Sequence, residues 1–343
     1  MCRTVLSAFL GLLFIPLATV ATSFEYEDRA RFGAGSDDRV IRIISTADIA
    51  FFTPLIDSFL AINPGTKIDY IVVSSTELIR AMEAENEAFD VAISSAMDLQ
   101  MKLANDGFAR RHISSATQNL PEWATWNDML FAFTQEPAAV VVSRAAFPPD
   151  EVPRTRQDLI ELLRQDPERF RGRVGTYDVR QSGLGYLFAT QDTRASDTFW
   201  RLAQVMGSLD ARLYCCSSDM IEAVRTGELL IAYNALGSYV ANRPDRSDFE
   251  IILPSDFTTM MLRTALIPAN APSPDLSGEF IDHLLQVSHG PEATPLTDPL
   301  LGSQSSETAL NRIQIGPGLL VFLDQLKRQA FLKEWEDAIV QSP

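Results

Sequence analysis

The sequence predicts an α/β protein of two lobes, each a mostly parallel sheet flanked by helices, with two crossing strands joining them. Three successive strand–loop–helix units follow residue 40, and this order favours a parallel sheet over a sandwich. A second group of such units fills the middle of the chain, between two apolar segments suited to cross between lobes. About 320 residues follow the N-terminal segment, a length that suits two domains.

The first lobe is expected to contain residues 40–137 and 260–343. A β-branched run at 40–44 predicts its first strand, and helical spacing at 52–62 stops at Asn63-Pro64-Gly65. Further elements are read from the same patterns: strands at 67–73, 89–93 and 264–267, and helices at 77–86, from Met97, at 277–287 and at 319–339.

The second lobe is expected at 138–259, with hinge strands at its ends, 138–142 and 250–253. Prolines 148, 149 and 153 break the chain after the first of these strands. The remaining elements alternate as in the first lobe: helices at 156–164 and 182–189, and strands at 173–178 and 229–233.

The N-terminus has the pattern of a cleavable secretory signal over residues 1–23. Arg3 precedes an almost wholly apolar run at 5–21, and small residues follow at Ala21-Thr22-Ser23, where we expect cleavage. An uncleaved anchor is the alternative, although the run is short for a membrane span. Residues 24–39 read as a flexible leader. The mature protein is therefore expected outside the cytoplasm.

The charge composition of the chain limits the classes of molecule that it is expected to bind. The formal net charge of −16 disfavours nucleic acid and anionic membranes as partners, but a local cluster of donors still permits an anionic ligand.

Of the three cysteines, Cys2 lies in the signal, and the adjacent pair Cys215-Cys216 provides no disulfide framework. Neighbouring α-carbons lie ~3.8 Å apart, whereas disulfides prefer ~5.5–6 Å, so a bridge within the pair would be strained. The alternative to a disulfide is that Cys215 and Cys216 are a pair of buried, unreactive thiols.

Hydroxyl residues follow the first three strands, and ligands of open α/β sheets bind beyond the carboxyl ends of strands. Each hydroxyl is also a good helix N-cap, which is the competing interpretation. Convergence of the loops favours a cradle of backbone N–H groups and hydroxyls for a polar or anionic head group. The predicted site residues are Ser45, Thr46, Ser75, Thr76, Ser94 and Ser95 of one lobe, with Arg180, Ser182, Gly183, Asn234, Ser238 and Tyr239 of the other.

The order of elements, with one lobe inserted into another, resembles the type 2 periplasmic binding proteins of ABC importers. The stretches at 93–100, 120–123, 177–186 and 233–239 are similar to the branch of extracellular solute-binding protein family 1 that holds ferric-iron, phosphosugar and aminoethylphosphonate binding proteins. The resemblance implies a monomeric periplasmic protein that takes a small-molecule ligand, docks on an inner-membrane permease and needs no cofactor. Similarity to a subgroup encoded beside two-component sensors implies an alternative, a ligand-sensing partner of a sensor-kinase ectodomain.

One departure from the family bears on the ligand. Iron-binding members place adjacent tyrosines in the loop that corresponds to residues 234–239, where this chain has only Tyr239. Ferric iron needs several anionic oxygen ligands, so a carboxylate, phosphate ester or phosphonate fits better and a ferric-iron protein is an alternative. Arg180 would pair with such an anion, or else form a surface salt bridge.

The sequence gives little support to catalysis. The three histidines, His112, His283 and His289, have no metal-binding spacing, and neither H-E-x-x-H nor G-x-S-x-G occurs. We therefore expect a binding protein rather than an enzyme, with an exported hydrolase of unfamiliar site as the alternative.

Overall fold

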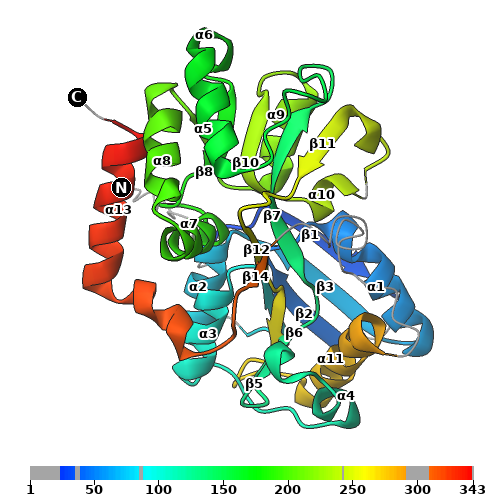
Figure 1. Ribbon diagram of the computed structural model, residues 1–343. Helices are drawn as coiled ribbons and strands as arrows, with labels where there is room; N and C mark the ends of the chain where they lie inside the picture. Colours follow the sequence, from blue (N-terminus) through cyan, green and yellow to red (C-terminus); the bar gives the residue numbers. More distant parts are fainter. Residues whose placement is uncertain (1–23, 35–38, 85–87, 242, 291–308, 342–343) are drawn as a thin grey trace, which may run out of the picture.

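The computed structural model describes residues 24–34, 39–84, 88–241, 243–290 and 309–341. Within these ranges the chain forms two lobes, each built on a seven-stranded sheet with helices around it (Figure 1). The two-lobed α/β architecture predicted from the sequence is confirmed, although both sheets are mixed rather than mostly parallel. The expected signal segment lies outside the described residues. No helix among the described residues is both long and apolar enough to span a membrane.

The first sheet has the order β1-β3-β2-β4-β13-β6-β5. Strand β2 runs parallel to β3 and β4, and the other pairs are antiparallel. Its strands are β1 (Asp28–Phe32), β2 (Val40–Ser45), β3 (Lys67–Val72), β4 (Val91–Ser94), β5 (Thr125–Trp126), β6 (Leu130–Ala132) and β13 (Thr264–Leu266). Its helices are α1 (Ile49–Ile62), α2 (Ser75–Glu83), α3 (Met97–Asn105), α4 (Ser115–Gln118) and α11 (Pro274–His289), with the 3₁₀ turn η1 (Glu122–Ala124).

The edge strand β1 lies where we expected a flexible leader. It pairs antiparallel with β3, and the Arg29 guanidinium donates to both carboxylate oxygens of Asp69. Its side chains alternate between exposed charge and partly buried Ala30 and Phe32. Such a short, charged strand protects a sheet edge, and its weak apolar signal explains why the sequence reads as a leader.

The second sheet has the order β14-β12-β7-β10-β8-β9, and β11 also pairs with β7. Its strands are β7 (Glu136–Ser143), β8 (Val174–Tyr177), β9 (Arg212–Tyr214), β10 (Ile231–Leu236), β11 (Phe249–Ile252), β12 (Thr258–Met261) and β14 (Leu310–Arg312). The helical elements of this half are α5 (Arg156–Gln165), α6 (Pro167–Phe170), α7 (Gly183–Ala195), α8 (Thr198–Ser208), α9 (Ser217–Arg225), α10 (Ser238–Ala241), η2 (Arg246–Asp248), η3 (Pro317–Leu323) and α13 (Gln325–Ile339).

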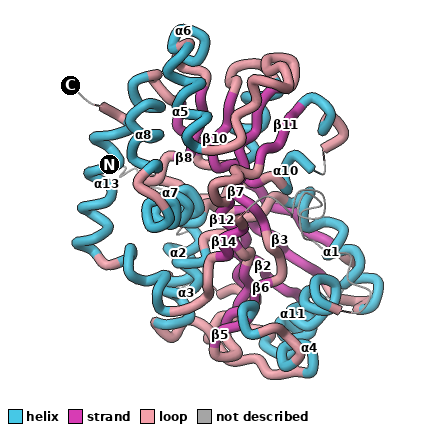
Figure 2. The backbone as a smooth tube through the Cα atoms, in the orientation of Figure 1, coloured by secondary structure: helices cyan, strands magenta, loops and turns pink. Residues whose placement is uncertain are grey.

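The predicted hinge strands lie in β7 and β11, which pair with each other, Ile251 opposite Val141. The chain passes from β6 of the first sheet to β7 of the second and returns from β12 to β13 (Figure 2). At this passage Arg263 contacts Glu136 at 2.9 and 3.2 Å, and neither side chain is exposed. The return crossing therefore follows β12 rather than β11.

The C-terminal helix α13 packs against α8, beside the second sheet, rather than completing the first lobe as we expected (Figure 1). Phe331, Trp335 and Ile339 join the same core as Phe199 of α8. An apolar stripe at helical spacing predicts that a face is buried, but it does not identify the partner, and this is why the sequence misplaced the helix.

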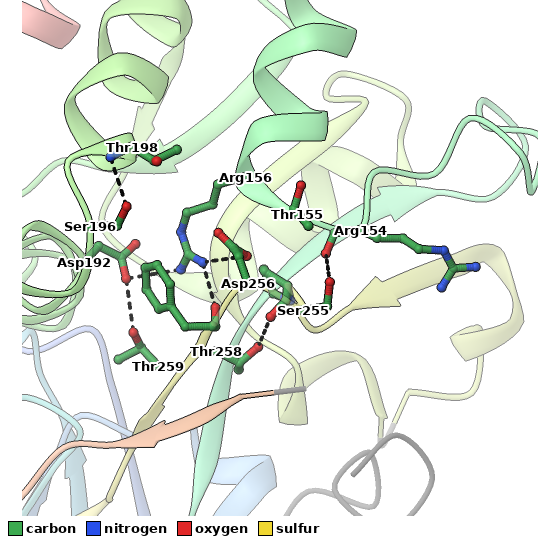
Figure 3. Close-up of polar contacts among 12 residues, drawn as sticks. Arg154, Thr155, Arg156, Asp192, Ser196, Thr198, Ser255, Asp256, Thr258 and Thr259 are labelled. Carbon is green, nitrogen blue, oxygen red and sulfur yellow. Dashed lines mark hydrogen bonds and ion pairs between the residues drawn. The ribbon is translucent and has the colours of Figure 1, made fainter. Parts of the chain in front are cut away.

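A buried polar network fixes α5 to the rest of the second lobe (Figure 3). The fully buried Arg156 contacts Asp192 of α7 at 3.3 Å and donates to the Phe257 carbonyl at 2.7 Å. Asp192 in turn accepts hydrogen bonds from Tyr233 and Thr259. Removing one partner of a buried pair leaves the other charge without compensation.

The substitution Arg156→Met is therefore expected to cost about 3–5 kcal/mol of unfolding free energy, measured by urea denaturation. Arg212→Met is the control, because Arg212 and Glu228 form an exposed pair whose loss costs at most about 1 kcal/mol. Equal, small losses in both variants would contradict a structural role for the Arg156–Asp192 pair.

Candidate functional site

A cavity with about 540 Å³ of empty space, open to solvent, lies between the lobes; we call it the interlobe cleft. Its walls come from loops at the carboxyl ends of strands, where open α/β sheets bind ligands. The polar first-lobe residues that line it are Glu27, Thr46, Asp48, Ser74, Ser75 and Ser95. From the second lobe come Tyr177, Gln181, Ser182, Cys215, Cys216 and Tyr239, among others.

Five of the predicted site residues line the interlobe cleft: Thr46, Ser75, Ser95, Ser182 and Tyr239. The Thr46 and Ser95 hydroxyls lie 3.4 Å apart, and the Ser95 N–H donates to Thr46. The Ser182 hydroxyl accepts from the Gly185 N–H and caps α7, so capping and cleft lining coincide there.

Four predicted residues have structural contacts instead. Ser45 accepts hydrogen bonds from the Ala47 N–H and the Tyr70 hydroxyl, and Ser94 accepts from the Ala96 N–H. Asn234 donates to Asp192 at 2.9 Å, and Ser238 donates to Glu136 at 2.6 Å. None of the four is among the residues that line the cleft.

The last three predicted residues, Thr76, Arg180 and Gly183, line a neighbouring cavity with about 460 Å³ of empty space. Arg180 donates to both carboxylate oxygens of Asp178, at 2.8 and 2.7 Å, and lies 3.6 Å from Glu336. Two carboxylates thus compensate its positive charge, which reduces its attraction for an anion.

The lobes touch at the rim between the two cavities. The Gly183 N–H donates to the Ser75 hydroxyl at 2.8 Å, and the Thr76 hydroxyl donates to the Gln181 carbonyl at 3.2 Å. The rings of Phe51 and Tyr239 stack across the lobes with centroids 6.2 Å apart. The two lobes are therefore in direct contact beside the cleft.

The electrostatics of the cleft depend on carboxylates that the sequence analysis did not select. Desolvation, together with Asp48 and Asp219, raises the pKa of Glu27 above its ordinary value. Burial also raises the pKa of Asp48, which Arg263 offsets in part. Asp48 is the N-cap residue of α1, yet its side chain makes no capping hydrogen bond. Among the described residues that line the cleft, none is Lys, Arg or His.

The histidines make contacts away from both cavities. His112 lies 2.8 Å from Asp282, His283 2.8 Å from the Ser58 hydroxyl, and His289 2.9 Å from the Ala132 carbonyl. Burial raises the pKa of the Tyr177 and Tyr239 phenols, which keeps both neutral. The cleft thus presents carboxylates, hydroxyls, neutral phenols and thiols.

No protein-family model and no curated protein sequence matches this chain. Among solved structures, the substrate-binding protein of an ABC transporter from Agrobacterium tumefaciens is similar, with 29% identity and a TM-score of 0.84, over 93% of this chain and 100% of that one. The periplasmic binding protein AfuA from Actinobacillus pleuropneumoniae, with fructose-6-phosphate bound, has 15% identity and a TM-score of 0.72, over 89% and 100%. Iron-bound HitA from Pseudomonas aeruginosa has 14% identity and a TM-score of 0.62, over 88% and 99%.

Gly183 allows the close approach of the lobes. A Cβ atom there would lie 2.5 Å from the Ser75 hydroxyl oxygen and 2.9 Å from a Leu99 methyl carbon. Gly183→Ala is therefore expected to cost about 1–3 kcal/mol of stability and to increase the radius of gyration in small-angle scattering. Gly318→Ala is the control, because nothing lies within 4 Å of that position. An unchanged radius of gyration for Gly183→Ala would argue against this contact.

The stability of the folded protein is expected to depend on pH through Asp98 of α3. Its Oδ1 atom has no hydrogen-bond partner among the described residues, and desolvation raises its pKa to about 7 from 3.8. Because the folded protein holds the proton more tightly, this stabilisation is complete below pH 3.8 and is lost as pH rises through about 7. Urea denaturation should show stability falling by up to about 1.4 kcal/mol per pH unit in this interval. Asp98→Asn should flatten that slope, whereas the exposed control Asp275→Asn should keep it.

Proposed function

We propose that this chain is a type 2 periplasmic solute-binding protein of an ABC transporter and that it captures a small polar ligand that carries a positive charge. Its two-lobed fold and cleft support the solute-binding role. The ligand class is our own inference, and it rests on the chemistry of the cleft described above.

One observation carries the proposal: Glu27 and Asp48 line the cleft, and no cationic side chain lines it among the described residues. Desolvation raises the pKa of both carboxylates, and repulsion by Asp219 raises both further. Repulsion by Asp48 also raises the pKa of Glu27. A bound cation would remove that repulsion, because an opposite charge favours the ionised form of a carboxylate. The cleft is thus arranged to attract positive charge.

The other groups suit a small polar molecule. The hydroxyls of Thr46, Ser95 and Ser182 supply hydrogen-bond donors and acceptors, and the Tyr239 ring supplies an apolar face. An ammonium or quaternary nitrogen beside such an aromatic ring also gains from the cation–π interaction.

The ligands that the sequence favoured have weaker support. A carboxylate, phosphate ester or phosphonate would meet Glu27 and Asp48 in the cleft, while Arg180 pairs with Asp178 outside it. A ferric ion would meet Tyr177 and Tyr239, whose phenols burial keeps protonated. An anion would thus meet charge of its own sign, and ferric iron would meet neutral phenols where it needs anionic oxygen ligands.

For the partner we propose an inner-membrane ABC permease, which the closed and open lobes would engage differently, with the protein in the periplasm. Pull-down from membranes with and without ligand distinguishes this partner from a sensor-kinase ectodomain, the alternative that the sequence raised. Recovery of a sensor kinase and no permease would favour sensing.

A thermal-shift panel of matched ammonium, neutral and carboxylate compounds identifies the ligand class, and calorimetry then tests the site. Asp48→Asn is expected to weaken binding of the selected cation about tenfold to hundredfold, because a charge-assisted contact contributes ~1.5–3 kcal/mol. Asp57→Asn, on the exposed face of the same helix, should bind like wild type.

Arg180→Ala completes the set, because it should also leave affinity unchanged if the ligand is a cation. If Arg180→Ala binds more weakly and Asp48→Asn binds like wild type, the proposal of a cationic ligand is wrong and an anionic ligand is favoured.

A further inference from the structure

We propose that Cys215, Cys216 and Asp219 form a binding site for a thiophilic divalent cation, such as Zn²⁺ or Cd²⁺, on the second-lobe wall of the interlobe cleft. This inference rests on the proposed function in one respect: a cation must be able to enter the cleft. The three ligand atoms all come from the second lobe, so the metal site does not require the two lobes to share an organic ligand. It goes beyond that function by naming a second subsite and a different class of ligand.

The turn from β9 to α9 brings the three groups together. Both sulfur atoms and a carboxylate oxygen lie within 4.8 Å of one another, and the Cys215 sulfur lies 3.6 Å from the Asp219 oxygen. In a tetrahedral zinc site, with Zn–S near 2.3 Å and Zn–O near 2.1 Å, a sulfur and an oxygen ligand are separated by about 3.6 Å. The observed spacing therefore suits a shared cation with little rearrangement.

The thiols are accessible rather than inert. Cys215 is exposed, Cys216 is partly exposed, and both line the interlobe cleft. Cys216 is the N-cap residue of α9, and its side chain makes no capping hydrogen bond. The thiolate is the form of cysteine that binds metals.

The charges that face the pair are negative. Glu27 lines the same cleft from the first lobe, and Asp219 adjoins the thiols in the first turn of α9. A divalent cation would compensate these carboxylates and replace the thiol protons, which pass to solvent.

Sulfur ligands select the cation. Thiolates favour zinc and softer ions over Mg²⁺ or Ca²⁺, which prefer oxygen ligands. An intramolecular bridge between the two thiols would compete with metal binding, but neighbouring α-carbons lie closer than an unstrained disulfide allows. A water molecule would supply the fourth ligand.

The test uses the exported protein, reduced with a phosphine and freed of reductant under nitrogen. Thiol counting first establishes that both cysteines are reduced, and Cd²⁺ is then titrated in. Wild type is expected to bind one Cd²⁺ per chain, with ultraviolet thiolate-to-metal charge-transfer absorption and release of thiol protons. Cys215→Ser and Cys216→Ser should each lose most of that absorption.

Asp219→Asn should bind Cd²⁺ at least tenfold more weakly, while Asp275→Asn, an exposed aspartate in the first turn of α11, should bind like wild type. No charge-transfer absorption from two reduced thiols, or equal affinity in Asp219→Asn and wild type, would overturn the site. Circular dichroism checks that each variant is folded.

The experiments distinguish failure of the metal site from failure of the proposed cationic ligand. Binding of the organic cation is measured on the same cysteine variants, and it depends on Asp48 rather than on the thiols. Loss of the thiolate signal leaves the Asp48 result intact, and an anionic ligand in the Asp48 experiment leaves the Cd²⁺ result intact.

Discussion

A buried ion pair between Glu136 and Arg263 lies where the chain passes between the two sheets. Glu136 begins β7, the strand that enters the second lobe, and Arg263 follows β12, the strand that returns. Burial by itself would raise the pKa of Glu136, but Arg263 and hydrogen bonds from Ser238 and Thr134 lower it below the ordinary value. Both crossings are therefore held at one ionised contact, and the relative position of the lobes depends on it.

This pair also determines the charge of the cleft. Arg263 lies close enough to affect Asp48, yet Glu136 compensates its positive charge within the protein interior. Arg180 is compensated in the same way by Asp178. Both of these cations thus form structural pairs, whereas the carboxylates of Glu27 and Asp48 line the cleft. This arrangement is the basis of the proposed preference for a positively charged ligand.

Closure and ligand chemistry are linked through a few short contacts. Gly183 approaches Ser75 closely only because it has no Cβ atom, and the Phe51 and Tyr239 rings meet across the same interface. The carboxylates of Glu27 and Asp48 and the Cys215-Cys216 pair line the cavity beside these contacts. Glu27 from the first lobe and the thiols from the second share one cavity, which neither lobe would form by itself.

The sequence by itself determined the α/β class, the two lobes and the loops that contribute to the cleft, because strand periodicity and hydroxyl residues at strand ends are local patterns. It could not decide which hydroxyl lines the cleft: Thr46 and Ser95 do, while their neighbours Ser45 and Ser94 accept hydrogen bonds from backbone N–H groups. Successive residues of a strand point to opposite faces, so only the packing of the sheet selects between them.

Tertiary structure alone decided the charge of the site and the position of α13. Arg180 pairs with nearby Asp178 and distant Glu336, and Glu27 reaches the cleft through an edge strand with little apolar signal. Helix α13 has an apolar stripe that fits either lobe, and contact with α8 fixes its place. The Arg180–Asp178 pair is local in the chain, but the contacts of Arg180 with Glu336 and of α13 with α8 join groups far apart in the sequence, which no local pattern records.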